Sequence, residues 1–371
     1  MDARHPAVEG LGVRQFNGRY AGKRVLLTGH TGFKGSWLAC WLAQLGAEVT
    51  GYALDPDATP NHWDLLDAPA TDIRGDVREL SPLMDAFAQS RPEVVFHLAA
   101  QTLVRQSYGD PLNSWSSNVM GTANVLEACR RTPGVRAVVV ITTDKVYANR
   151  EWPWGYREND TLGGHDPYSA SKAACEMVVD SYRKAFWHAP DAPLVASARA
   201  GNVIGGGDWA ADRLVPDLVR AVTAGVPLEI RHPQATRPWQ HVLECLSGYL
   251  MLGERLLAGE RHCADAWNFG PAHADNRRVG DILAALARHW PELRWQAAPP
   301  SPLHEAGLLQ LDCARAHSVL GWQPVLGLDE ALALTAQWYR HHHATGQATT
   351  RAQLDHYLAA AQAAGTRWIT P

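Results

Sequence analysis

The feature that most constrains the fold is a glycine-rich turn between two apolar segments near the N-terminus. Residues 23–28 form a short apolar run, and residues 29–35 read Gly-His-Thr-Gly-Phe-Lys-Gly. A helical pattern of apolar residues follows as far as Leu45, and residues 47–52 read as the next strand. Strand, glycine loop, helix and strand in this order predict the start of a parallel sheet, with a pyrophosphate bound at the helix N-terminus.

The alternation of strands and helices continues to about Asn202. It predicts an α/β fold, a Rossmann-type doubly wound parallel sheet with helices on both faces. We therefore expect a dinucleotide-binding domain at residues 20–200 and a smaller, mixed C-terminal domain at residues 201–345, mainly for substrate, some segments of which can return to the first domain. Residues 346–371 are expected to form a polar, alanine-rich helical tail.

Further residues extend the expected cofactor site along the chain. Asp76 follows a strand and can accept a bond from an adenine amine, and residues 94–100 form a buried strand that ends in small residues. Asn118 is expected to open a helix, either as a cofactor contact or only as a helix cap. The predicted cofactor contacts are Gly29, Thr31, Gly32, Phe33, Lys34, Gly35, Asp76, Val77, Leu98, Ala99, Ala100, Asn118, Thr142, Tyr168 and Lys172.

The end of the second strand lacks the acidic residue that usually holds the adenosine ribose. Tyr52, Ala53 and Leu54 stand there, and Asp55 comes slightly late. No arginine follows at once to bind a 2′-phosphate, so the sequence favours NAD over NADP.

Residues 143–172 carry a set of groups suited to proton transfer. Tyr168 and Lys172 are four residues apart, so on a helix they share a face, and the ammonium group can lower the pKa of the phenol from about 10. Thr143, Asp144 and Lys145 follow a buried run and add a hydroxyl, a carboxyl and an amine. The Tyr-x-x-x-Lys spacing alone is common for surface pairs, but its occurrence with the other three groups predicts a catalytic set.

Composition excludes several other classes of protein. A chain of 371 residues with 46% apolar content can fill a large core, and a net charge of −4 argues against a general nucleic-acid binder. No signal peptide is visible in residues 1–20, and no apolar run is long enough to span a membrane. The six cysteines are scattered, which predicts reduced thiols in the cytoplasm. Adjacent residues such as His341, His342 and His343 cannot converge on one ion, so no metal site is expected.

Several strings resemble a known family. They are Thr-Gly-His-Thr-Gly-Phe-Lys-Gly at 28–35, Ala-Ala-Gln at 99–101, Asp-Lys at 144–145, Glu-Trp-Pro-Trp-Gly-Tyr-Arg-Glu-Asn at 151–159, Arg-Ala-Gly-Asn-Val-Ile-Gly-Gly-Gly-Asp-Trp at 199–209 and Arg-Pro-Trp-Gln-His-Val at 237–242. From about Tyr20 to Tyr339 the chain resembles the CDP-D-glucose 4,6-dehydratase family of the extended short-chain dehydrogenase/reductase superfamily. The dTDP-glucose enzymes usually carry Thr-Asp-Glu where this chain has Thr-Asp-Lys, so Lys145 points to the CDP-sugar branch.

The resemblance implies that CDP-glucose is converted into CDP-4-dehydro-6-deoxy-D-glucose, with NAD regenerated in each cycle. Tyr168, assisted by Thr143 and Lys172, would take the C4 hydroxyl proton. Lys145 would be the base at C5, and Asp144 would be the acid that protonates the departing C6 oxygen. Each of the three residues at 143–145 also has a purely structural interpretation, as a strand, turn or surface residue. A C4 epimerase, a dehydratase for another nucleoside diphosphate hexose and a silent NAD-binding module remain alternatives.

Predicted substrate contacts come mainly from the second half of the chain. Arg213 and Arg237 can bind the two phosphates bidentately, or form surface ion pairs instead. Amides suit sugar hydroxyls, and an indole can pack against a sugar or base or in the core. The predicted set is Gln101, Asn202, Trp209, Arg213, Arg237 and His241, with Trp239, His304 and Glu305 as further candidates.

Oligomerisation is also expected. The helices after Pro111 and after Tyr168 carry apolar faces. The resemblance implies that such helices pair into a four-helix bundle between two subunits, so we expect a homodimer.

Overall fold

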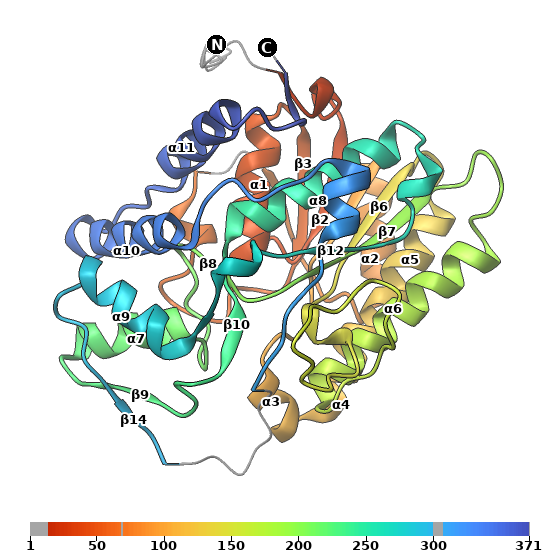
Figure 1. Cartoon of the computed structure of the whole chain (residues 1–371). Helices are drawn as coiled ribbons and strands as arrows, with labels where there is room; N and C mark the ends of the chain where they lie inside the picture. The colour runs from red at the N-terminus through yellow and green to blue at the C-terminus, as the bar shows by residue number, and fades with distance from the viewer. Residues whose placement is uncertain (1–13, 68–69, 300–306, 371) are drawn as a thin grey trace, which may run out of the picture.

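The computed structural model describes residues 14–67, 70–299 and 307–370. Its centre is a seven-stranded parallel sheet with the strand order β12-β7-β6-β5-β2-β3-β4 (Figure 1). The strands are β2 (Arg24–Thr28), β3 (Glu48–Ala53), β4 (Ala70–Arg74), β5 (Val94–His97), β6 (Ala137–Ile141), β7 (Leu194–Ala200) and β12 (Ala266–Phe269). The predicted Rossmann-type sheet is confirmed.

Helices cover both faces of the sheet, as Figure 1 shows. Successive side chains of β5 point to opposite faces: Val94 and Phe96 join the core on one side, and Val95 joins the core on the other. Because both faces are buried, the central strands are continuous apolar runs. One face is covered by α1 (Phe33–Gln44) and α8 (Val242–Leu257), and the other by α2 (Leu80–Ser90), α5 (Gly121–Arg131) and α6 (Pro167–Ala185).

The helix that contains Asn118 begins earlier than predicted. A helical stretch runs from α4 (Pro111–Trp115) through a π-helical turn at Ser116–Met120 into α5. Asp110 caps it by accepting a hydrogen bond from the backbone N–H of Asn113 at 3.0 Å, and Pro111 occupies the first turn. The prediction that Asn118 opens the helix was therefore wrong. Its side chain lies in a π turn, a distortion that is frequent at functional sites.

The second half of the chain is built from short elements around two that return to the sheet. α8 and β12 pack with the sheet, while the remaining elements form small two-stranded pairs and peripheral helices. They are β8 (Val203–Ile204), α7 (Leu214–Ala224), β9 (Leu228–Ile230), β10 (Thr236–Pro238), β11 (Gln240–His241), β13 (Asn276–Arg278), α9 (Val279–His289), β14 (Trp295–Ala297) and α10 (Leu328–Thr345). In the first half, the short helix α3 (Val104–Gly109) follows β5.

The C-terminal segment is part of the core. α11 (Thr350–Ala363) lies next to α10 on the side of α1 in Figure 1, and the ring of its Tyr357 lies 5.7 Å from that of Trp41 on α1. β15 (Ile369–Thr370) pairs antiparallel with β1 (Arg14–Gln15). The predicted helical tail is thus a packed element that covers α1.

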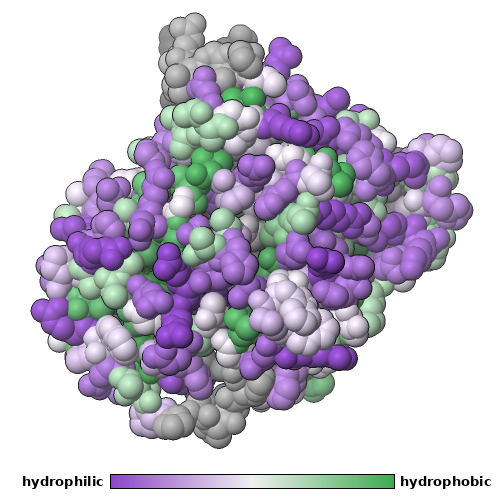
Figure 2. Space-filling model, in the orientation of Figure 1, coloured by the Kyte–Doolittle hydropathy of each residue, from purple (hydrophilic) through white to green (hydrophobic). Residues whose placement is uncertain are grey.

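The surface in Figure 2 is largely hydrophilic, with scattered apolar side chains. Among the described helices, none combines the length and hydropathy needed to cross a bilayer. All six cysteines are buried and unpaired.

Candidate active site

The glycine loop brings backbone closely together at the start of α1. Gly29 has φ of +75°, and a Cβ on it would lie 2.6 Å from the backbone nitrogen of Ala99. A Cβ on Gly35 would lie 2.0 Å from the carbonyl oxygen of Gly29. Gly32 precedes α1 without a side-chain cap, so the first N–H groups of the helix and its positive dipole end are open to an anion. These residues fit the pyrophosphate of NAD.

The end of β5 lies against this loop and is held by side chains. Thr28 Oγ1 accepts hydrogen bonds from the backbone N–H groups of Leu98 and Ala99, both at 3.2 Å. Asn118 Oδ1 accepts from the backbone N–H of Gln101 at 2.8 Å, while its amide donates to Gln101 O at 3.0 Å and to Ser171 Oγ at 2.8 Å. Asn118 therefore fastens the loop after β5 to α6.

Tertiary packing brings an arginine side chain to the end of the second strand, where the acidic residue that usually holds the adenosine ribose is missing. Arg74, at the end of β4, donates to Leu54 O at 3.2 Å and to Asp72 at 2.7 Å. Asp55 is exposed and lies 3.7 Å from Arg74, and Thr31 Oγ1 also donates to Leu54 O, at 3.0 Å. Sequence reasoning missed Arg74 because it belongs to the third strand of the unit rather than the second.

Asp76 and Val77 lie just beyond β4. The Asp76 carboxylate accepts from Arg78 Nε at 2.8 Å, and this hydrogen bond lowers the pKa of Asp76. Val77 is buried beneath Gly121 of α5, where a Cβ would lie 2.7 Å from its side chain.

The predicted catalytic residues meet at the carboxyl end of β6. A short 3₁₀ helix at Asp144–Val146 follows the strand, and Thr143 Oγ1 donates to Asp144 Oδ1 at 3.0 Å. α6 begins at Pro167 with Asp166 as its cap, which places Tyr168 and Lys172 on the face toward β6. Lys172 Nζ donates to Ile141 O at 3.0 Å. Thr143, Asp144, Tyr168 and Lys172 are all buried.

Burial dominates the titration of these groups. It raises the pKa of Tyr168 to about 12, although a hydrogen bond with Thr143 acts in the opposite direction. The sequence predicted that Lys172 would lower the pKa of Tyr168, but in the structure that pKa is raised. Burial lowers the pKa of Lys172 itself. Burial also raises the pKa of Asp144, against the opposing charges of Lys145, Arg237 and Lys34. Asp144 Oδ2 is buried and has no hydrogen-bond partner among the described residues.

Two arginines reach this cluster from the second half of the chain. Arg213 pairs with Asp208 at 2.9 Å and donates to Thr102 at 2.8 Å, and its charge lowers the pKa of Tyr168. Arg237, on β10, lowers the pKa of Asp144 and donates to Thr236 O at 2.9 Å. Both predicted phosphate ligands thus lie close enough to the catalytic groups to act on them electrostatically.

Other predicted substrate residues make mainly internal contacts. Trp209 packs against Trp338 and Tyr339 of α10, with ring centroids 5.5 and 5.9 Å apart. His241 caps α8 and packs edge-on to Trp37 at 6.0 Å, and burial lowers its pKa to about 3.

The remaining predicted contacts are also placed by the fold. Trp239 is buried and donates to Arg277 O at 3.2 Å, and the Gln101 amide donates to Leu103 O at 2.9 Å. Asn202 O accepts from the backbone N–H of Gln240 at 3.0 Å. His304 and Glu305 lie outside the described residues.

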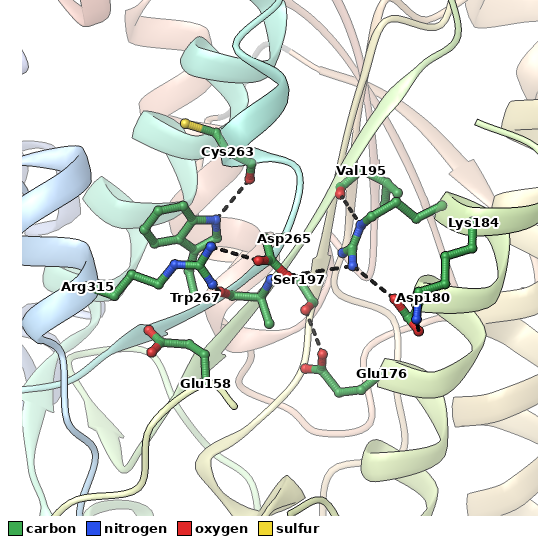
Figure 3. A network of polar contacts seen from close by, with 12 residues as sticks. Glu158, Glu176, Asp180, Lys184, Val195, Ser197, Cys263, Asp265, Trp267 and Arg315 are labelled. Carbon is green, nitrogen blue, oxygen red and sulfur yellow. Dashed lines mark hydrogen bonds and ion pairs between the residues drawn. The ribbon is translucent and has the colours of Figure 1, made fainter. Parts of the chain in front are cut away.

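A buried carboxylate behind the cluster was not predicted. Glu176 lies one turn beyond Lys172 on α6 and accepts from Thr142 Oγ1 at 2.5 Å and Ser197 Oγ at 2.6 Å, the latter bond being drawn in Figure 3. Arg199 donates to both of its oxygens at 3.0 Å. The sequence signal was present: Glu176 repeats the four-residue spacing of Tyr168 and Lys172, so it lies on the same buried face.

The fold and site define a class, the nucleotide-dependent enzymes in which a Tyr-x-x-x-Lys helix faces a Rossmann sheet. A family model described as the NAD dependent epimerase/dehydratase family matches residues 25–270, and the chain belongs to this family. More particularly, it is a homologue of CDP-glucose 4,6-dehydratase, a hydro-lyase: it is 45% identical over 329 residues to that enzyme of Salmonella typhimurium, covering 86% of this chain and 91% of the relative.

More distant relatives agree with this assignment. A dTDP-glucose 4,6-dehydratase of Streptomyces antibioticus is 30% identical over 338 residues, covering 86% of this chain and 93% of that protein. The solved structure of MoeE5 in complex with UDP-glucose and NAD is 29% identical, with a TM-score of 0.72, and covers 86% of this chain and 99% of that chain. The family is NAD-dependent, and NAD is the cofactor of this chain.

Proposed function

We propose that the protein converts CDP-D-glucose into CDP-4-dehydro-6-deoxy-D-glucose. The observation that carries this proposal is the buried group of Thr143, Asp144, Tyr168 and Lys172 beside Lys145, because elimination of water needs an acid and a base in addition to the residues that oxidise C4. The 45% identity to a CDP-glucose 4,6-dehydratase supports the choice of nucleotide.

The glycine loop and the end of β5 would hold NAD, with Gly29, Gly32 and Gly35 leaving room for the pyrophosphate. When bound, NAD would supply the hydride acceptor for oxidation at C4 and the hydride donor for C6, with a proton returning to C5 in the last step. Tyr168 takes the C4 hydroxyl proton, and Thr143 shares that proton through its hydroxyl. Because burial raises the pKa of Tyr168 to about 12, this base needs positive charge beside it. The charge of Arg213 already lowers that pKa, and Lys172 on the same helix face would add to it when protonated.

Elimination uses the two residues at the turn after β6. Once C4 is a ketone, the C5 proton is alpha to a carbonyl and can be removed by Lys145. Asp144 gives a proton to the C6 oxygen, which leaves as water. Burial raises the pKa of Asp144, so the carboxyl group is favoured in the protonated form that an acid needs.

The second half of the chain would supply most of the substrate contacts. Arg213 and Arg237 bind the diphosphate, and their charges already act on Tyr168 and Asp144. Residues 201–345 form mainly the substrate-binding domain, apart from α8 and β12.

The enzyme works as a homodimer in the cytoplasm, a proposal supported by exposed apolar residues on α4 to α6 and by six unpaired cysteines.

A substrate panel tests the proposal. The protein is incubated with NAD and with CDP-, dTDP-, UDP- or GDP-glucose, and the 4-keto-6-deoxy product is detected by its absorbance in alkali. CDP-glucose is expected to react best, and no product from any of the four would refute the dehydratase assignment. In deuterated water a dehydratase incorporates deuterium at C5, whereas a C4 epimerase leaves C5 unlabelled.

A further inference from the structure

A chain of buried hydrogen bonds joins the C-terminal helix to the first turn of α1 through His62. The Ser36 hydroxyl lies 2.7 Å from His62 Nδ1, and the Thr350 hydroxyl lies 2.7 Å from His62 Nε2. At one end the Trp338 indole donates to Thr350 Oγ1 at 3.1 Å, and at the other Ser36 Oγ donates to Phe33 O at 2.9 Å. We name these five residues the His62 relay.

The relay has one direction that satisfies all of its polar atoms. An indole N–H can only donate, so Thr350 accepts from Trp338 and gives its single proton to His62 Nε2. His62 Nδ1 then carries the ring proton and donates to Ser36, whose own proton goes to Phe33 O. Each member thus depends on its neighbour for a complete set of partners, and a loss at one end leaves buried groups unpaired along the line.

Packing fixes the ring of His62 in this position. Trp37 lies 5.2 Å from it and Trp338 lies 5.6 Å from it, measured between ring centroids. On a third side, a Cβ added to Gly207 would lie 2.4 Å from the ring. Burial lowers the pKa of His62 to about 3, so the ring stays neutral at physiological pH.

We propose that His62 is a positioning residue, which fixes the pyrophosphate-binding end of α1 by connecting it to α11. The relay ends on Phe33 O and Ser36, within the first turn of α1, which directly follows the glycine loop. Small shifts of that turn change how its N–H groups and dipole meet a bound pyrophosphate. The inference rests on the proposed placement of NAD at the glycine loop.

The hydroxyl of Thr350 provides the test, because it is the group through which α11 enters the relay. α11 lies outside residues 25–270, which the family model matches. The full chain, freed of bound nucleotide, is titrated with NAD by calorimetry. Thr350→Val removes the hydroxyl and is expected to weaken NAD binding by roughly 3- to 30-fold. Thr350→Ser keeps the hydroxyl and is expected to restore binding to about the wild-type value. At saturating NAD, kcat for CDP-glucose should change little in either variant, since the relay does not touch the reacting atoms.

Tyr357→Phe is the matched control on the same helix. It also removes one buried hydroxyl, which donates to Glu244 at 3.1 Å but lies outside the relay. It is expected to lower thermal stability without changing the affinity for NAD. Equal weakening by Thr350→Val and Tyr357→Phe would overturn the proposal, because general loosening of α11 would then explain both.

Unchanged NAD affinity in Thr350→Val would also overturn the proposal. If Thr350→Val does not fold, Ser36→Ala tests the other end of the relay, with the same expected loss of affinity and the same contrary outcome. A wild-type protein that does not bind NAD would instead refute the cofactor site itself. A protein that binds NAD but does not convert CDP-glucose would refute the proposed function and would not contradict the role of the relay.

Discussion

At the residue scale, burial has the same effect on each of three groups in the site. It raises the pKa of Tyr168 and Asp144 and lowers that of Lys172, so each is pushed toward its neutral form. A neutral Asp144 suits proton donation to a leaving oxygen, whereas a neutral Tyr168 must lose its proton before it can act as a base. The site therefore favours the acid of the elimination step and requires added positive charge for the oxidation step.

Lys145→Ala separates the two steps. Elimination is expected to be lost, because no amine remains to take the C5 proton, while C4 oxidation stays detectable as reduced nicotinamide absorbance in a single turnover. Tyr168→Phe is the comparison variant, and it is expected to lower both steps by roughly 10²- to 10⁴-fold. Equal loss of both steps in Lys145→Ala would mean that the base lies elsewhere.

At the element scale, α6 is held to the sheet by a buried ion pair behind the catalytic face. Glu176 on α6 and Arg199 on β7 are both almost fully buried, and Thr142 and Ser197 complete the set of donors to the carboxylate. Buried pairs of this kind fix the position of one element relative to another, because any shift that separates the charges leaves one of them unpaired in the interior, which is strongly unfavourable.

Glu176→Gln is expected to destabilise the protein by about 3–5 kcal/mol, since Arg199 loses its ionic partner. Urea unfolding measures the change. Asp180→Asn removes a half-exposed charge on the same helix that pairs with Lys184 and Arg183, and it is expected to have a much smaller effect. Similar losses in the two variants would contradict the role given to the buried pair.

A second buried carboxylate connects α8 to the C-terminal segment. Glu244 Oε1 accepts from the backbone N–H groups of Leu326 at 2.7 Å and Val325 at 3.0 Å, and its Oε2 accepts from Tyr357 at 3.1 Å. Burial nevertheless raises the pKa of Glu244 to about 7. The native protein therefore holds this proton over a range in which the unfolded chain has lost it.

The sign of the pH effect follows from linkage. The contribution of Glu244 to stability is fully present below the unfolded pKa of about 4.3 and declines as the pH rises toward 7. Glu244→Gln is expected to remove this decline, by up to about 3 kcal/mol between pH 5 and pH 8. Urea unfolding of both proteins at the two pH values is the measurement, and parallel pH profiles would rule out the assignment.

At the scale of the whole molecule, apolar side chains remain exposed on one set of adjoining helices. Leu112 and Trp115 lie on α4, Met120 in the π turn, and Met177 and Phe186 at α6 and its end. Exposed apolar residues on adjoining helices are typical of an interaction surface, which supports the proposed homodimer with a four-helix bundle between its subunits.

Met177→Glu is expected to shift the protein from two chains to one, because a charge would be buried in the bundle. Light scattering gives the mass of the particle. Val226→Glu changes an equally exposed apolar residue beyond α7 and is expected to leave the dimer intact. A wild-type mass of one chain would contradict the dimer directly.

Local pattern was sufficient for much of the architecture. The apolar run before Gly29, the helix that follows and the four-residue spacing of Tyr168 and Lys172 each depend on residues close in the chain, so periodicity and glycine placement predicted them. A helix after Pro111 was expected, but Asn118 was wrongly placed at the start of a separate helix, because a π turn joins the two segments into one helical stretch.

What the sequence by itself determined was the Rossmann-type sheet and the residue types available for chemistry at the end of β6. Only the tertiary structure decided how those groups titrate, that Arg74 reaches the ribose edge, and that α11 connects to α1 through His62. The physical reason is that burial and hydrogen bonding depend on which distant segments pack together: Ser36 and Thr350 are neighbours of one imidazole ring, although 314 positions separate them in the chain.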